Sequence, residues 1–240
     1  MINLITLAGD GTRFANEGYK LPKPLIPVNG LPMIFRAVDS LPKADKYVFV
    51  CKKEHVEKYN LDSVLSRAYP NVEIISIDKT TEGQACTAEI GISGSSITED
   101  DEILISSCDY GLKWNKDLYD KIDSDIIVWS TIHNKAFSND PDSYSWLDVD
   151  KNNNLLKTHV KQKVFDDSFN NHAIVGTFYF KKAKYFLDGL KQIYTNNITS
   201  NGEYYIDNIF NSITNLNIKI FDVKEYYCWG TPKDLKNYEN

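Results

Sequence analysis

The sequence has few of the residues from which disulfide frameworks, zinc sites and redox centres are built. Its 240 residues include four cysteines and four histidines. The cysteines are scattered and form no Cys-x-x-Cys pair, which excludes a zinc site of the usual spacing and a disulfide framework. We expect buried, reduced thiols instead. The histidines show no metal-ligand spacing either. The residues concerned are Cys51, Cys86, Cys108 and Cys228, and His55, His133, His159 and His172.

Long apolar runs and an excess of positive charge are also missing. No stretch reaches the ~18 apolar residues of a membrane span. The first residues, MINLITLAGDG, lack the basic region of a signal peptide. The net charge is −6 and the isoelectric point is near 5.3, which argues against a nucleic-acid partner because such proteins normally present a basic face. We therefore expect a cytoplasmic protein. A locally basic cleft remains compatible with its overall charge.

Short apolar runs alternate with helical stretches over residues 1–132. β-Branched and aromatic residues gather in these runs, which predicts strands at 2–7, 46–51, 72–77, 102–107 and 125–132. Between them, helical spacing or helix-start residues predict helices at 31–41, 53–69 and 82–93, and 8–22 is typical of a polar loop. The alternation predicts an α/β fold with a mainly parallel sheet covered on both faces. Ligands of such sheets bind at the carboxyl ends of the strands.

Residues 133–240 follow a less regular pattern. Alternation around an Asn-rich turn predicts a hairpin at 143–164. The same kind of pattern predicts strands at 172–180 and 217–223, and helices at 182–194, 202–214 and 231–240. No linker or internal repeat separates the two parts. We therefore expect one domain over residues 1–240, in which 133–240 add a small β-rich extension to 1–132.

The glycine-rich loop after the first predicted strand fits neither of the two common phosphate-binding patterns. The Walker A pattern, G-x-x-x-x-G-K-[ST], occurs nowhere in the sequence. The dinucleotide fingerprint, G-x-G-x-x-G, fails because Phe14 follows Gly9 and Gly11 at the place of the third glycine. The loop, LAGDGTRFANEGYKLPKPLIPVNG at residues 7–30, therefore needs another interpretation.

This loop nevertheless carries the chemistry of phosphate binding. Gly9 and Gly11 let backbone N–H groups approach phosphate oxygens closely. Arg13 adds a rigid fork of donors that matches a phosphate. Lys23 adds a point charge, and the prolines on both sides of it restrict the backbone that presents it. The combination predicts a site for the phosphates of a nucleoside triphosphate, with Lys23 placed to attract a second phosphate.

The chain resembles the sugar-phosphate nucleotidyltransferases in several separated segments. "LAGDGTRF" followed by "LPKPLIPVNGLPMI" is similar to the signature of that family in order and spacing. The likeness continues nearly to the end of the chain, and "EGQACTA" together with "CWGTPKDL" is similar to the branch found in capsule and surface-polysaccharide clusters. The later segments are "TEGQACTAEIG" (81–91), "LISSCDYG" (104–111), "VGTFYF" (175–180), "GEYYIDNIFNSI" (202–213) and "CWGTPKDL" (228–235).

The resemblance implies a Rossmann-like, GT-A-like mixed sheet with a β-rich acceptor-binding extension. It also implies an enzyme that moves a nucleoside monophosphate from a nucleoside triphosphate to a phosphorylated acceptor and releases pyrophosphate. CTP is the favoured triphosphate, with UTP and dTTP as alternatives. The acceptor is a sugar 1-phosphate or a non-sugar phosphate such as phosphoglutamine or phosphocholine. Whether the terminal helix forms a homodimer contact stays open.

The resemblance also assigns roles to residues of the first half. Arg13 and Lys23 would be catalytic, with Arg13 on the triphosphate and Lys23 between the α-phosphate and the acceptor. No protein nucleophile is required, because the reaction depends on positioning and charge neutralisation. The nucleotide itself would contact Leu7, Ala8, Gly9 and Gly11, and the base would lie against Gly83 and Gln84.

The cofactor implied by the resemblance is Mg²⁺, held by Asp109, which follows the predicted strand 102–107. Mg²⁺ prefers one or two carboxylates together with phosphate oxygens. Many relatives carry a second metal-binding aspartate two residues before the Gly-Thr-Pro of the last motif. This chain has Cys228 there, and a thiol is a poor Mg²⁺ ligand. Asp207 and Asp222 are both open as substitutes.

The acceptor site is matched less well. Gly176 corresponds to the family's acceptor glycine, and Lys163 to the lysine of its Glu-Lys pair, but Gln162 replaces the glutamate. Lys161 is a rival, two residues earlier on the same face of an expected strand. Glu203 could take the place of the missing glutamate; it is equally typical of a helix N-terminus.

Two other classes of protein compete with this interpretation. Glycosyltransferases use a similar fold and an Asp-x-Asp motif, and this chain has three such triplets, at 123–125, 140–142 and 148–150. Each lies at a predicted turn or junction and none follows the fourth strand, so we interpret them as turn carboxylates. A non-catalytic, nucleotide-binding regulatory protein is the second alternative, and Cys228 favours it.

Overall fold

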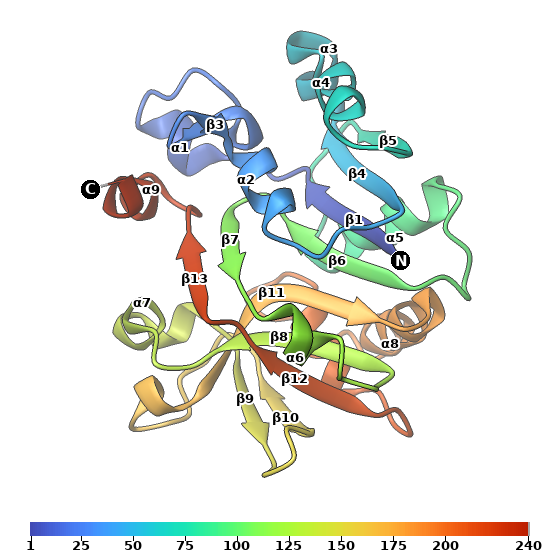
Figure 1. Ribbon diagram of the computed structural model, residues 1–240, viewed down its shortest axis with the longest axis vertical. Coiled ribbons are helices and arrows are strands. Elements are labelled where there is room, and N and C mark those ends of the chain that lie inside the picture. The colour runs from blue at the N-terminus through green and yellow to red at the C-terminus, as the bar shows by residue number, and fades with distance from the viewer. Residues whose placement is uncertain (240) are drawn as a thin grey trace.

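The structure is a computed structural model that describes residues 1–239, so Asn240, the last residue of the predicted terminal helix, lies outside the described residues. Its main sheet is built from β1 (Ile2–Leu7), β4 (Lys46–Lys52), β5 (Val72–Ile77), β6 (Ile103–Ser107), β8 (Ile126–Thr131), β9 (Trp146–Val149), β10 (Leu155–His159), β11 (His172–Phe180) and β12 (Ile218–Asp222). Within the described chain the strand order is β10-β9-β11-β6-β1-β4-β5, and β8 lies between β11 and β12 (Figure 1).

The sheet is mixed, with a parallel part and an antiparallel part. β1 lies between β4 and β6, β5 follows β4, and all four strands are parallel. β11 runs antiparallel to β6, β8 and β9. This arrangement confirms the predicted α/β fold. Successive residues of β1 point to opposite faces, so Leu4 and Ile5 are both fully buried but belong to different apolar clusters.

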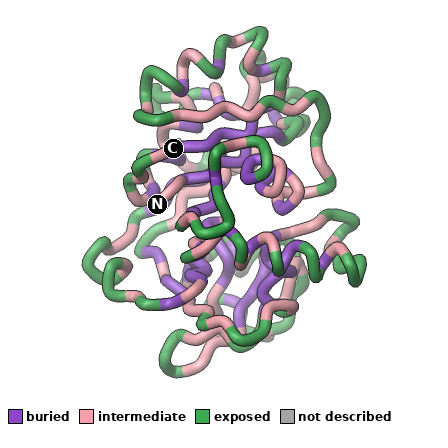
Figure 2. The backbone as a smooth tube through the Cα atoms, turned by 90° about the vertical axis from the view of Figure 1, so that its right-hand side faces the viewer, coloured by how far each residue is buried: buried purple, intermediate pink, exposed green. Residues whose placement is uncertain are grey.

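Helices cover both faces of the sheet. α5 (Gln84–Gly94), α8 (Ala183–Thr195) and the 3-10 helix η4 (Ile206–Asn211) pack on one face, and α2 (Met33–Asp39) and α4 (Leu61–Ala68) on the other. Figure 2 shows buried residues through the interior of the molecule and exposed residues in many of the outer loops. In residues 1–239, none of the helices is long and apolar enough to cross a membrane. The shorter helices are α1 (Thr12–Asn16), α3 (Lys53–Tyr59), α6 (Lys116–Tyr119), α7 (Lys135–Asn139), η1 (Lys23–Leu25), η2 (Pro141–Ser143) and η3 (Ser168–Asn170).

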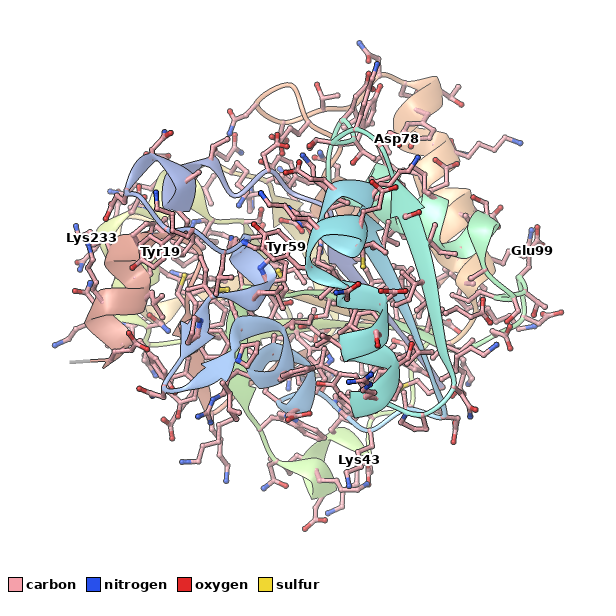
Figure 3. The ribbon with its side chains drawn as sticks, turned by 90° about the horizontal axis from the view of Figure 1, so that it is seen from above. Tyr19, Lys43, Tyr59, Asp78, Glu99 and Lys233 are labelled. Carbon is pink, nitrogen blue, oxygen red and sulfur yellow. The ribbon has the colours of Figure 1, made fainter. Side chains whose placement is uncertain are left out.

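The described residues also form two small sheets, one of which brings residues 225–228 back to residues 110–113. β2 (Pro27–Val28) pairs with β3 (Leu31–Pro32), and β7 (Tyr110–Lys113) pairs with β13 (Glu225–Cys228). The sequence patterns did not predict β7 or β13. After β13, α9 (Pro232–Glu239) lies beside the loop that follows β1; Figure 3 shows this helix, which carries Lys233, next to the segment that carries Tyr19.

Three local predictions were wrong. The predicted polar loop 8–22 contains α1. The predicted helix 53–69 is broken at Asn60, whose left-handed φ of 50° separates α3 from α4; asparagine tolerates that conformation. The predicted helix 202–214 forms only η4, because Ser200 and Glu203 pair with each other through their backbones before it.

Candidate functional site

The carboxyl ends of parallel strands meet at one edge of the sheet and border a cleft of about 480 Å³. Thr6 of β1 lies in register with Ser107 of β6, and Leu7 of β1 with Cys51 of β4. The loops that follow β1 and β6 therefore face one another across this edge. The cleft is lined by most of the predicted site residues, namely Leu7, Ala8, Gly9, Gly11, Arg13, Lys23, Gly83, Gln84, Asp109 and Glu203.

The two glycines of the loop after β1 serve different purposes. Gly11 begins α1 with φ of 62°, and a Cβ there would lie 3.2 Å from Cβ of Lys23. The position therefore requires glycine for its backbone and for close packing against the lysine. A Cβ on Gly9 would meet no described heavy atom within 4 Å, so this backbone is open to a ligand in the cleft.

Lys23 and Asp109 form an ion pair inside the cleft. Lys23 Nζ lies 2.7 Å from Asp109 Oδ2, and their side chains are 19% and 29% exposed. Burial acts to lower the pKa of Lys23 and to raise that of Asp109, but their mutual attraction outweighs it: the pKa of Lys23 is raised and that of Asp109 is lowered. Ser107 Oγ also donates to Asp109 Oδ1 at 2.6 Å. Both side chains are therefore charged, and the ion pair holds each of them in its orientation in the cleft.

The start of α5 ties the cleft to the second half of the chain. Gly83 has φ of 139°, and a Cβ there would lie 2.4 Å from the carbonyl oxygen of Tyr204. The Tyr204 N–H donates to Glu82 O at 2.8 Å, and the Ala85 N–H donates to Tyr204 O at 3.2 Å. Gln84 Nε2 lies 3.2 Å from Thr6 Oγ1. The predicted base-binding loop is thus held by backbone contacts with the segment that carries Glu203.

The two candidate acceptor lysines lie in different surroundings. Lys163 is exposed, its N–H donates to Asp142 Oδ1 at 2.8 Å, and it is not among the described residues that line the cleft. The expectation that Lys161 lies on a strand was wrong, because β10 ends at His159 and Lys161 has a left-handed φ of 51°. This turn directs the two lysines differently.

Lys161 points between two tyrosine rings. Its Nζ lies 5.1 Å from the ring centre of Tyr205 and 5.9 Å from that of Tyr144, and it donates to Ser143 O at 2.7 Å. Burial, followed by Glu203, raises the pKa of Tyr205 to about 12, while Arg13 acts in the opposite direction. Tyr205 therefore connects Lys161 with the cleft. The sequence patterns gave no role to either tyrosine.

Gly176 lies behind the cleft and is not among the described residues that line it. Its φ is 93°, and a Cβ there would lie 3.3 Å from Cε1 and from the hydroxyl of Tyr110. That hydroxyl forms hydrogen bonds with Ser106 Oγ at 2.7 Å and Thr177 Oγ1 at 2.8 Å. Gly176 is therefore required for its backbone conformation and for close packing against Tyr110, independently of any contact with an acceptor.

Three carboxylates line the cleft in the described residues, those of Asp10, Asp109 and Glu203. Asp10 pairs with Lys52 and Asp109 with Lys23, and Asp109 is the one that follows β6, where the sequence predicts the metal ligand. Burial raises the pKa of the Cys228 thiol to about 12, so it stays protonated. Asp207 is buried and bonded to Ser145, and Asp222 accepts from Ser130 Oγ at 2.8 Å and lies 2.9 Å from His172 Nδ1.

Over the described residues, no group of three or more His, Cys, Asp or Glu side chains is placed to hold a metal ion. Asp109 by itself still fits Mg²⁺, because that ion takes one or two carboxylates and completes its shell with phosphate oxygens and water. The donor set therefore suits a Mg²⁺ ion that arrives with a triphosphate.

Comparisons with known proteins show which fold this is. No protein-family model matches the chain. The nucleoside-diphosphate-sugar pyrophosphorylase of Vibrio cholerae has a TM-score of 0.80 at 17% identity and covers 100% of this chain and 99% of its own. The inositol-1-phosphate CTP transferase of T. maritima has a TM-score of 0.75 at 18% identity and covers 99% of this chain and 93% of its own. The chain has the fold of these structures.

One curated relative is similar in sequence. The bifunctional protein GlmU of Methanococcus aeolicus is 23% identical over 164 residues, which are 67% of this chain. The match covers 36% of GlmU, so the chain spans about a third of that protein.

Proposed function

We propose that this chain is a nucleotidyltransferase that moves a nucleoside monophosphate from a nucleoside triphosphate to a phosphorylated acceptor. One observation carries the proposal: loops from three separate regions of the sequence converge on a single cleft and place the Lys23 ammonium 2.7 Å from the Asp109 carboxylate. A cation and a metal-binding carboxylate side by side, beside open glycine backbone, suit a polyphosphate better than a neutral ligand.

The chemistry follows from these charges. An oxygen of the acceptor phosphate attacks the α-phosphorus, the bond to the bridging oxygen of the β-phosphate breaks, and pyrophosphate leaves with that electron pair. Arg13 would hold the triphosphate, and Lys23 would turn from Asp109 toward the α-phosphate and the acceptor, where negative charge gathers. A bound Mg²⁺ would supply further charge neutralisation beside Asp109. The chain's own task is to align two anions that repel each other.

For the acceptor, we favour Lys161 over Lys163 as the lysine that meets its phosphate. Lys161 is directed toward Tyr205, which adjoins Glu203 in the cleft lining. The acceptor remains a sugar 1-phosphate or a non-sugar phosphate such as phosphoglutamine or phosphocholine. CTP is the favoured triphosphate, from the sequence resemblance and from the CTP transferase among the fold neighbours. Capsule or surface-polysaccharide biosynthesis is the setting we propose, on the resemblance alone.

A glycosyltransferase is less well supported. None of the aspartates of the three Asp-x-Asp triplets is among the described residues that line the cleft. Asp150 closes the β9–β10 turn by accepting from the N–H groups of Asn152 and Asn154. Asp125 accepts from the N–H of Asn217. These carboxylates have structural partners of their own.

The decisive experiment is pyrophosphate release in the presence of Mg²⁺. CTP, UTP, dTTP, ATP and GTP are each combined with sugar 1-phosphates, inositol 1-phosphate, phosphocholine and phosphoglutamine. We expect release with one triphosphate and one acceptor class. Triphosphate binding without release for any pair would instead favour the non-catalytic regulatory protein.

A further inference from the structure

A buried tryptophan, Trp229, contacts the segment that carries Asp109, the proposed metal-binding carboxylate. Trp229 follows β13, and its side chain is 2% exposed. The backbone N–H of Trp229 donates to the backbone carbonyl oxygen of Asp109 at 2.8 Å. Its ring fills the space beside Gly111, since a Cβ on that glycine would lie 2.6 Å from Cη2 and 3.0 Å from Cζ2. Trp229 therefore contacts the start of β7 through both its backbone and its ring.

The same tryptophan belongs to the apolar cluster under the phosphate-binding loop. That cluster contains Phe14, which is 1% exposed and adjoins Arg13 in α1. Lys23 Nζ lies 5.9 Å from the Phe14 ring centre. Leu235 of α9 joins the cluster, and Lys236 of that helix pairs with Glu17 after α1. The segment after β13 thus contacts the backbone of Asp109 and shares an apolar cluster with Phe14, whose ring lies near Lys23.

We propose that Trp229 is a positioning residue that fixes the distance between the Asp109 carboxylate and the cations Arg13 and Lys23. The inference rests on the proposed function, and it assigns a role in that function to a residue that does not line the cleft. Protein interiors are close-packed, so a gap at Trp229 is transmitted to its neighbours. A misplacement of about 1 Å at a reacting centre costs up to about 10²-fold in rate.

The test is a double-mutant cycle between Trp229→Phe and Gly111→Ala. Gly111 has no left-handed φ, so alanine is compatible with its backbone, and the three atoms nearest to the new Cβ all belong to the Trp229 ring. We expect each single variant to lower kcat about tenfold and to raise the Mg²⁺ concentration for half-maximal activity, with the nucleotide KM within about twofold of wild type. In the Trp229→Phe background the shorter ring leaves room for the new methyl group, so Gly111→Ala should add less than about twofold.

The matched control is Trp129→Phe, the same substitution at a fully buried tryptophan in another cluster. It should lower the thermal unfolding midpoint and leave kcat and the Mg²⁺ dependence unchanged. The proposal is overturned if Trp229→Phe behaves like Trp129→Phe, or if Gly111→Ala costs the same factor in both backgrounds.

If wild type releases no pyrophosphate with any pair, the proposed function fails, and amide hydrogen exchange tests the positioning separately. Faster exchange at residues 107–112 and 12–16 in Trp229→Phe, but not in Trp129→Phe, supports it. Equal exchange in the two variants overturns it.

Discussion

The two halves of the molecule form their proposed binding surfaces in different ways. In residues 1–132, the cleft is made by backbone at the ends of parallel strands, and glycines such as Gly9 and Gly11 expose it. In residues 133–239, the surface around Lys161 is made by side chains, chiefly the rings of Tyr144 and Tyr205. Under the proposed function, the backbone groups would recognise what all triphosphates share, and the side chains would distinguish one acceptor from another.

The lysines proposed to bind phosphate in the two halves, Lys23 and Lys161, also differ in the partners of their ammonium groups. Lys23 has a full counter-charge at 2.7 Å in Asp109. Lys161 has a carbonyl oxygen, two aromatic faces and the buried carboxyl of Asp207, whose pKa burial raises although Lys161 acts to lower it. These partners stabilise an ammonium less than a charged carboxylate in direct contact does. We therefore expect changes at Lys23 to affect turnover and changes at Lys161 to affect acceptor affinity.

The largest effect is expected for Lys23→Ala, which should lower kcat by at least ~10²-fold because one positioned charge is lost at the transition state. Lys20→Ala is the matched control, since Lys20 is an exposed lysine of the same loop, and it should retain wild-type turnover. Steady-state pyrophosphate release measures both. A well-folded Lys23→Ala protein with near-normal turnover would remove this lysine from the mechanism.

Asp109→Asn should come next, with kcat about tenfold or more lower and a higher Mg²⁺ requirement, because an amide is a weaker ligand than a carboxylate. Titration of activity with Mg²⁺, together with circular dichroism to confirm folding, measures the effect. Full activity at the wild-type Mg²⁺ concentration would mean that the metal binds elsewhere.

The acceptor half is tested by Lys161→Ala against Lys163→Ala. We expect the first variant to raise the acceptor KM about tenfold and the nucleotide KM much less, because the lost charge would meet only the acceptor phosphate. Lys163→Ala should change neither constant by more than about twofold. If Lys163→Ala has the larger effect on the acceptor KM, Lys163 is the acceptor lysine, as the sequence predicts.

The sequence predicted the fold of residues 1–132 well because its signals are local. Apolar runs mark the parallel strands, and glycine and proline mark the backbone of the loop that carries Lys23. Parallel strands bring their carboxyl ends together, so the proximity of Lys23 and Asp109 followed from topology. Asparagine is common in turns, so Asn60 was a sign that the predicted helix would break. The helical spacing of the apolar residues around it hid that sign.

The structure of residues 133–239 depends on contacts that no local signal reveals. Lysine rarely adopts a left-handed φ, and nothing near Lys161 in the sequence marks the turn that points it at Tyr205. Residues 225–228 form β13 only because β7, far away in the chain, offers a partner. Trp229 acquires its neighbours through the same long-range pairing.

The connection between the halves is tested by Gly83→Ala. The new Cβ would lie 2.4 Å from Tyr204 O at a φ of 139°, so we expect a loss of about 2 kcal/mol in the free energy of unfolding and a higher nucleotide KM. Gly18→Ala is the control: Gly18 has φ of 82° but no described heavy atom within 4 Å of its Cβ position. It should lose about 1 kcal/mol from strain alone. Equal losses in urea unfolding would show that the Tyr204 contact is unimportant.

The smallest effect concerns the pH dependence of stability. The pKa of Asp109 is lowered in the folded protein, so its contribution is present above the ordinary value of 3.8 and is lost as the pH falls through the folded value. The pKa of Lys23 is raised, so its contribution is present below 10.5 and is lost as the pH rises through the folded value. Because both side chains are partly exposed, we expect Asp109→Asn to cost on the order of 1 kcal/mol between these limits.

Urea unfolding of wild type and Asp109→Asn from pH 2.5 to pH 8 measures that difference. It should be constant well above pH 3.8 and shrink as the pH falls from 3.8 through the lowered pKa of the folded protein, since protonated aspartic acid and asparagine are both neutral. A difference that persists unchanged at the lowest pH would mean that Asp109 stabilises the fold through its shape and hydrogen bonds. The ion pair with Lys23 would then contribute to catalysis and not to stability. The two halves would differ in their effects on turnover and on acceptor affinity only.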